Sequence, residues 1–102
     1  MSKTVEYFLN PTPEDRVRIV FTKDRGEITH FIVQYYALIK DRWRTIQRFD
    51  NCHGGAHRHT YHLRGWEFKV SLGDDLSAAF TEAKTTVIKQ FRKIKENFMM
   101  SR

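Results

Sequence analysis

The sequence predicts an α+β domain in which an antiparallel β-meander of four to five strands packs against one long C-terminal helix. Two observations support this fold class. Between residues 16 and 49 apolar and polar residues alternate in runs separated by short turns, as expected for half-buried antiparallel strands. After residue 75 apolar residues instead recur every three or four positions, which is typical of the buried face of a helix.

Three strands are expected over residues 16–23, 27–39 and 42–49. Gly26 lies in the turn between the first two, and Lys40-Asp41 forms the turn between the second and third. Such short turns join only antiparallel neighbours, so these strands should form a meander. In the third strand, simple alternation places Trp43 and Phe49 on one face and Ile46 on the other.

The two ends of the predicted sheet have weaker signals. Residues 4–9 alternate only weakly and predict an edge strand, which the prolines at positions 11 and 13 end because proline lacks the backbone donor that a ladder needs. Residues 66–72 alternate again and predict the last strand. The stretch between, residues 50–59, is expected to be a loop or the irregular start of that strand.

The C-terminal helix is expected from about residue 75 to residue 98. Asp74, Asp75 and Ser77 are candidate N-cap residues, and basic residues at 92, 93 and 95 suit the C-terminal end of the helix dipole. Its expected core stripe consists of Leu76, Phe80, Ala83, Val87, Phe91, Ile94 and Phe98.

Size and composition narrow the class of protein. The 102 residues suffice for a single domain, residues 1–102. Cys52 is the only cysteine, which excludes an internal disulfide scaffold, and no segment has the apolar length of a membrane span. We therefore expect a cytoplasmic protein without a membrane partner. The formal net charge of +6 favours a polyanionic partner, of which nucleic acid is the most common.

A histidine tract, residues 50–62, is the strongest functional signal. It holds four of the five histidines, His53, His57, His59 and His62. One interpretation is a metal-independent ribonuclease, since histidine exchanges protons near neutral pH. Asp50 would orient a histidine and Asn51 would assist at the same site. The phosphate would be bound by arginines and approach two adjacent glycines closely, namely Arg48, Arg58, Arg64, Gly54 and Gly55.

Other interpretations stay open from the residues alone. The ribonuclease would need no cofactor, whereas in one alternative His53, His57 and His59 hold a divalent metal. In another, the tract only shapes a turn. A third is a non-catalytic basic binding protein, such as a phage-borne or mobile-element-borne inhibitor of a nucleoprotein, that uses Lys89 and Lys93 on the outer face of the helix.

The run from Arg48 to His59 resembles the small toxins of the TumE type, which carry a tract of the form (R)-x-D-N-x-H-G-x-x-H-x-H between several strands and a C-terminal amphipathic helix. The matched positions are Asp50, Asn51, His53, Gly54, His57 and His59. The resemblance implies the toxin of a type II toxin–antitoxin pair, silenced by a helix-turn-helix antitoxin protein. RNA and a second copy of the chain, in a homodimer, are the other partners that we consider.

Overall fold

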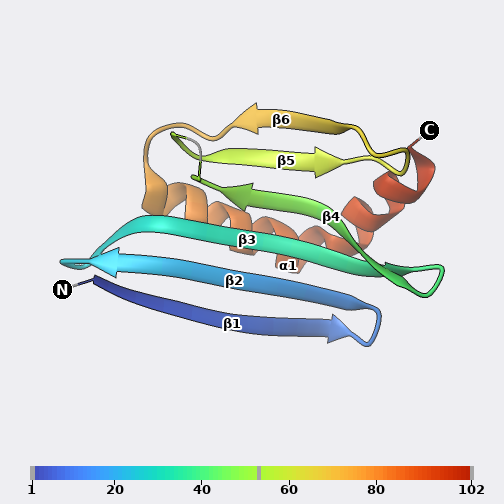
Figure 1. The fold of residues 1–102 in the computed structure, drawn as a ribbon, viewed down its shortest axis with the longest axis horizontal. Coiled ribbons are helices and arrows are strands. Elements are labelled where there is room, and N and C mark those ends of the chain that lie inside the picture. Colours follow the sequence, from blue (N-terminus) through green and yellow to red (C-terminus); the bar gives the residue numbers. More distant parts are fainter. Residues whose placement is uncertain (1, 53, 102) are drawn as a thin grey trace.

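The structure, a computed structural model, describes residues 2–52 and 54–101 and shows an α+β fold, as predicted. Over these residues six strands form one antiparallel sheet in chain order, followed by one helix (Figure 1). The count is one strand above the predicted range. The elements are β1 (Ser2–Thr12), β2 (Asp15–Asp24), β3 (Glu27–Ile39), β4 (Arg42–Asp50), β5 (His57–Tyr61), β6 (Glu67–Ser71) and α1 (Leu76–Met100).

The additional strand is β5, which begins in the stretch expected to be a loop or the irregular start of the last strand. It has five residues and pairs with both β4 and β6. A tight turn over residues 62–66 then reverses the chain, with the His62 N–H donating to the Trp66 carbonyl (2.9 Å) and Gly65 at φ +95°. Such a short strand shows too few alternations to be recognised from its sequence.

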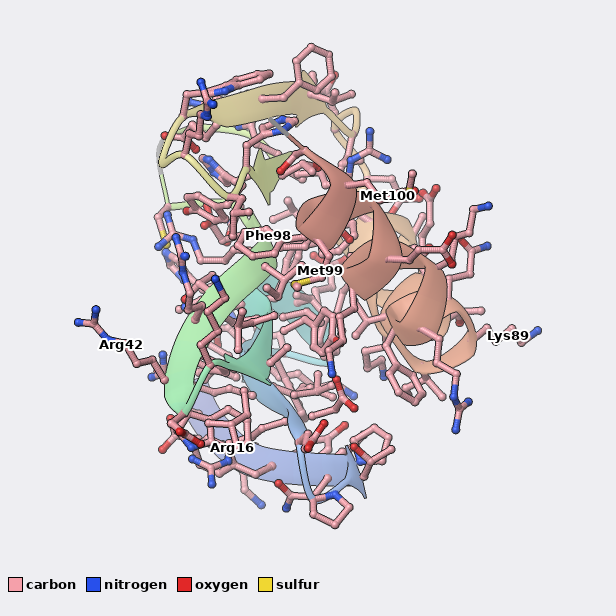
Figure 2. All side chains as sticks on the ribbon, turned by 90° about the vertical axis from the view of Figure 1, so that its right-hand side faces the viewer. Arg16, Arg42, Lys89, Phe98, Met99 and Met100 are labelled. Carbon is pink, nitrogen blue, oxygen red and sulfur yellow. The ribbon has the colours of Figure 1, made fainter. Side chains whose placement is uncertain are left out.

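The helix packs across one face of the sheet, against β3 and β4 (Figure 1). Figure 2 shows Phe98 pointing from α1 toward the sheet and Lys89 pointing away from it. The predicted stripe is confirmed, and Ala79 is added to it. The buried side chains of α1 meet those of the sheet in one core, which includes Val17, Ile19, Phe31, Val33, Tyr35, Ile46 and Phe49. We call the sheet face opposite α1 the open face.

Both ends of the helix are tied down by side chains. The Asp75 side chain caps the N-terminus by accepting a hydrogen bond from the Ala78 N–H (3.0 Å). At the other end the Ser101 hydroxyl donates to the Phe98 carbonyl (2.6 Å) and accepts from the Leu63 N–H (2.8 Å). The C-terminal end of α1 is therefore joined to the turn between β5 and β6. Among the described residues, no helix is both long and apolar enough to cross a membrane.

A register shift in β4 changes which side chains share a face. Thr45 pairs with Tyr36, whereas Gln47 pairs with Tyr35, so Ile46 is an extra residue between them. Because side chains alternate between faces, this irregularity puts Trp43 on the open face and Phe49 on the helix face. The prediction that Trp43 and Phe49 lie on one face is therefore wrong, since a bulge is invisible to simple alternation.

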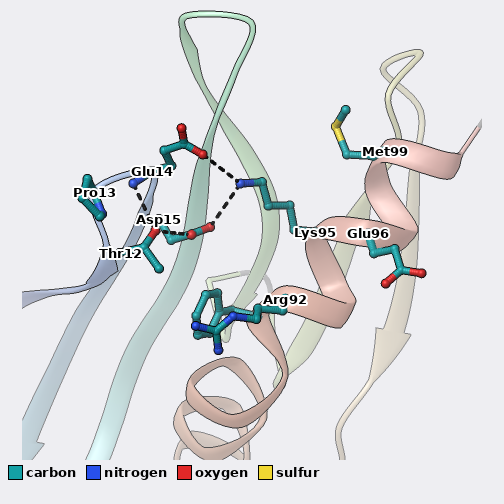
Figure 3. Close-up of a pocket in the computed structure, with 9 residues that line it drawn as sticks. Thr12, Pro13, Glu14, Asp15, Arg92, Lys95, Glu96 and Met99 are labelled. Carbon is teal, nitrogen blue, oxygen red and sulfur yellow. Dashed lines mark hydrogen bonds and ion pairs between the residues drawn. The ribbon is translucent and has the colours of Figure 1, made fainter.

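A buried carboxylate also joins the two layers near the C-terminal end of α1, at the turn between β1 and β2. Asp15 is 4% exposed, and its two oxygens accept hydrogen bonds from the Tyr35 and Thr12 hydroxyls, both at 2.5 Å. Figure 3 shows Lys95 reaching from α1 toward Glu14 and Asp15, at 3.7 and 3.9 Å. A buried carboxylate is tolerated only with such partners, so this network fixes α1 against the turn between β1 and β2.

Replacing Tyr35 with Phe tests this network. The variant loses one hydrogen bond to a carboxylate, and its free energy of unfolding should fall by about 1.5–3 kcal/mol. Burial raises the pKa of the Tyr35 phenol well above its usual value near 10, and Asp15 adds to this. The unfolded chain then loses the proton at a lower pH than the folded chain, so this stabilisation is present below pH ~10 and declines above it.

Denaturant unfolding at neutral and alkaline pH measures both effects. The stability difference between wild type and Tyr35→Phe should shrink above pH ~10. Tyr7→Phe, the same change at an exposed tyrosine of β1, is the control and should stay within about 0.5 kcal/mol of wild type. Equal stability of the two variants at neutral pH would contradict the role given to Asp15.

Candidate functional site

The pairing of β4 with β5 brings two of the tract's histidines, His57 and His59, to the open face together with Asp50 and Arg48. Arg48 lies opposite His59, and Asp50 lies opposite His57. Directly opposed residues of antiparallel strands project from the same face. Phe49, between Arg48 and Asp50, is buried in the core beneath α1, so these four side chains belong to the face opposite α1.

Asp50 is the buried centre of this group, with only 1% of its surface exposed. Its Oδ1 accepts a hydrogen bond from the Cys52 N–H (3.1 Å). Its Oδ2 lies 2.6 Å from Nε of Arg48 and 3.7 Å from Nε2 of His59. A carboxylate leaves water at high cost unless cations and donors surround it, so the Arg48 guanidinium and the loop backbone together hold Asp50 in place.

His59 stands between two carboxylates. Its Nδ1 lies 2.8 Å from Oε2 of Glu67, and Nε2 faces Asp50 without a hydrogen-bond partner within the described part of the chain. An ionised carboxylate only accepts, so we assign the Nδ1 proton to the bond with Glu67. The side chain is 5% exposed. The bond to Glu67 and the burial of the ring make His59 a residue that ties β5 to β6 rather than one that touches a substrate.

His57 is the more accessible histidine of the pair. It is half-buried, and its Nδ1 lies 3.1 Å from the Gly55 carbonyl. Since a carbonyl only accepts, this contact puts the proton on Nδ1 and leaves Nε2 as the basic nitrogen. Gly54 and Gly55 have φ of +73° and +92°, a conformation that favours glycine. The chain therefore turns sharply enough to return as β5 beside β4.

The Asn51 side chain forms the hydrogen bonds that a strand backbone would otherwise make with β3. Its Oδ1 accepts from the Phe31 N–H (3.0 Å), and its Nδ2 donates to the Thr29 carbonyl (2.9 Å). The amide thus continues the hydrogen bonding of β3 beyond the end of β4. This geometry gives Asn51 a structural role at the base of the loop.

The remaining predicted residues are not brought to this group. Arg58 pairs with Phe49 and Val70, on the helix face. Arg64 is exposed in the turn at the other end of β5. His62 stacks on Trp66 in the same turn, with ring centroids 3.5 Å apart. His53 lies outside the described residues.

The candidate ligands that the structure describes do not gather into a metal centre. Among residues 2–52 and 54–101, no three side chains of His, Cys, Asp or Glu come together in a way that could hold a metal ion.

Cys52 is exposed, but partial desolvation and the Asp50 carboxylate raise the pKa of its thiol. A protonated thiol is a weak nucleophile, so Cys52 is a poor candidate for covalent chemistry.

Glu67 and Lys69 were missed in the sequence. Lys69 lies directly opposite His59, and Glu67 contacts the same ring. They lie close to His59 because of the register between β5 and β6. This register could be predicted only if β5 were recognised as a separate strand. A short alternating run after the glycine pair was the one available signal.

Replacing Asn51 with Ala tests its structural role. The Phe31 N–H and the Thr29 carbonyl would lose their partner, and the free energy of unfolding should fall by about 1–3 kcal/mol. Amide hydrogen exchange at Phe31 should accelerate. Asn10→Ala, at an exposed position of β1, is the matched control. Unchanged exchange at Phe31 in the Asn51 variant would show that the side-chain amide does not extend the sheet.

Comparison with known proteins places the chain in a family without assigning an activity. No curated protein and no solved structure is detectably similar to it. A family model described as a domain of unknown function, DUF7718, matches residues 1–102. This match carries no statement about toxins, so the resemblance of the tract to TumE-type toxins stays a prediction. The whole chain belongs to the DUF7718 domain family.

Proposed function

We propose that this protein is a metal-independent ribonuclease that cleaves RNA on the open face of its sheet. The observation that carries the proposal is the position of His57, an accessible imidazole directly opposite the buried Asp50 beside the guanidinium of Arg48. Proton exchange near neutral pH and a fixed cation for a phosphate are the two requirements of RNA transesterification.

The reaction needs no external nucleophile. His57 Nε2 accepts the proton of a ribose 2′-hydroxyl while the 2′-oxygen forms a bond to phosphorus. The bond from phosphorus to the 5′-oxygen breaks, and this oxygen receives a proton from a second acid. The products are a 2′,3′-cyclic phosphate and a 5′-hydroxyl end. The sequence predicts that His53 shares the acid and base roles, which makes it the candidate for this second acid.

Arg48 supports this chemistry by its charge and accessibility. It contacts Asp50 through Nε, yet its side chain stays 32% exposed. A guanidinium has five N–H donors in a fixed fork, so one carboxylate contact leaves donors for a phosphate oxygen. Asp50 and His59 act as positioning residues, because they hold Arg48 and the two strands and are themselves buried.

The biological setting of the proposal comes from the tract. Its resemblance to TumE-type toxins supports a cytoplasmic toxin whose partner is a helix-turn-helix antitoxin protein. Under this proposal, expression of the chain alone arrests bacterial growth by RNA cleavage. A reading frame for a small helix-turn-helix protein beside the gene would support it, and a surrounding block of phage genes would favour the binding protein described next.

A binding protein without catalysis is the second candidate. It is favoured by the contacts of Asn51 and His59, two predicted catalytic residues whose side chains are taken up by the fold. In that case the exposed lysines on the outer face of α1, Lys89 and Lys93, would dominate the interaction. Charge reversal there would then matter more than loss of the histidines.

The His57→Ala variant separates these functions. Removing one general acid–base group should lower the rate of RNA cleavage by about 10²–10⁴-fold, with thermal stability close to that of wild type. The assay uses purified protein without a histidine tag, in the presence of a chelator, and identifies cyclic phosphate ends by mass spectrometry. The same variant should abolish growth arrest on expression.

His62→Ala is the matched control, since His62 lies in the turn beyond β5 and stacks on Trp66. It should cleave RNA at the wild-type rate. Full cleavage by His57→Ala would refute the catalytic proposal. Loss of activity only after charge reversal at Lys89 and Lys93 would support the binding protein in its place.

A further inference from the structure

We infer that the open face binds a single-stranded RNA segment across the sheet, with bases stacked in an aromatic groove that lies on the same face as the histidine tract. This inference names the substrate class of the ribonuclease proposed above and rests on it for the identity of the reaction. The groove itself was not among the predicted site residues. Its support comes from strand register, exposed aromatic rings and cations.

A row of side chains, all polar except Phe8, connects the groove with the tract. The register pairs one residue of each strand with the next, and all six project from the open face. Neighbouring strands are about 4.8 Å apart, so the row is about 24 Å long. From β1 to β6 it consists of Phe8, Arg18, Gln34, Arg48, His59 and Lys69.

The groove lies at the β1 to β4 end of this row. It is a cavity of about 370 Å³ that combines three aromatic rings with two guanidinium groups. Phe8 is 50% exposed and Trp43 is 41% exposed. The Arg16 guanidinium lies 4.6 Å from the centre of the Trp43 ring, on the side of the sheet away from α1 (Figure 2). The lining residues are Phe8, Arg16, Arg18, Tyr36 and Trp43.

These aromatic rings are not needed for the core. The core lies on the other face, beneath α1, whereas Trp43 and Phe8 face solvent. A partly exposed ring with a guanidinium over one face suits a planar partner that carries negative charge. An unpaired nucleotide has both properties, because its base stacks on the ring and its phosphate meets the arginine.

The charge of the open face and the exposed ring of Trp43 favour single-stranded RNA as the ligand of the groove. The chain has a formal net charge of +6, and Arg16, Arg48 and Lys69 are on the open face. In a duplex the faces of the bases are covered by stacking between neighbouring base pairs, so only a single strand can stack its bases on Trp43. A length of about 24 Å suits a run of about four nucleotides, the short end of sites for single-strand binding.

The test measures binding separately from cleavage. The probe is a short fluorescein-labelled 2′-O-methyl oligouridine, which lacks the nucleophilic hydroxyl and cannot be cleaved by the proposed reaction. Fluorescence anisotropy should give a Kd that rises about 5- to 150-fold in Trp43→Ala, the effect of one lost base–aromatic stack. Trp43→Phe should keep most of the affinity. Trp66→Ala, at an exposed ring outside the groove, should bind as wild type does.

Each outcome decides between the proposals. Weakened binding only in Trp43→Ala, with lower affinity for a duplex of the same length, supports the groove. An unchanged Kd in Trp43→Ala, or tighter binding of the duplex, overturns it. Intact binding of the probe without cleavage of unmodified RNA would retain the groove and refute the ribonuclease. Thermal unfolding of each variant confirms that the exposed substitutions leave the fold intact.

Discussion

The sheet is covered on one side by the only helix of the described residues, and this asymmetry determines where chemistry can take place. Apolar side chains of β2, β3 and β4 are used against α1. The alternate residues of the same strands face away from α1 and are free to be charged, polar or aromatic. The helix is held near its C-terminal end by Lys95 against Asp15 and by Ser101 against the turn between β5 and β6, and Asp75 caps its N-terminus. The open face is therefore presented on a backbone with a fixed register.

The two buried carboxylates, Asp15 and Asp50, differ in their position and in their partners. Asp15 lies at the layer interface and is satisfied by hydroxyl groups and a distant lysine. Asp50 instead lies on the open face and is paired closely with Arg48, which remains partly exposed. The first arrangement engages both carboxylate oxygens within the layer interface and leaves Asp15 buried. The second holds a cation at the surface next to an accessible histidine, which is why the functional proposal is built on it.

The sequence predicted the fold class and the helix well, because long periodic segments carry strong signals. It placed Arg48, Asp50, His57 and His59 together, and the structure does bring these residues to one group. It did not reveal that Arg58 faces the other side, since five residues of β5 show little alternation. Nor did it reveal the bulge at Ile46, which moves Trp43 onto the open face. Both features depend on pairing between strands rather than on any local pattern.

The open face as the functional surface is the central claim, and the two tryptophans of the chain report on it directly. Trp43 lies in the groove on that face, and Trp66 lies in the turn beyond β5. In an NMR titration of the isotope-labelled protein with the uncleavable oligouridine, the Trp43 indole and His57 ring signals should shift while the Trp66 indole signal stays. Shifts confined to α1, around Lys89 and Lys93, would contradict the account.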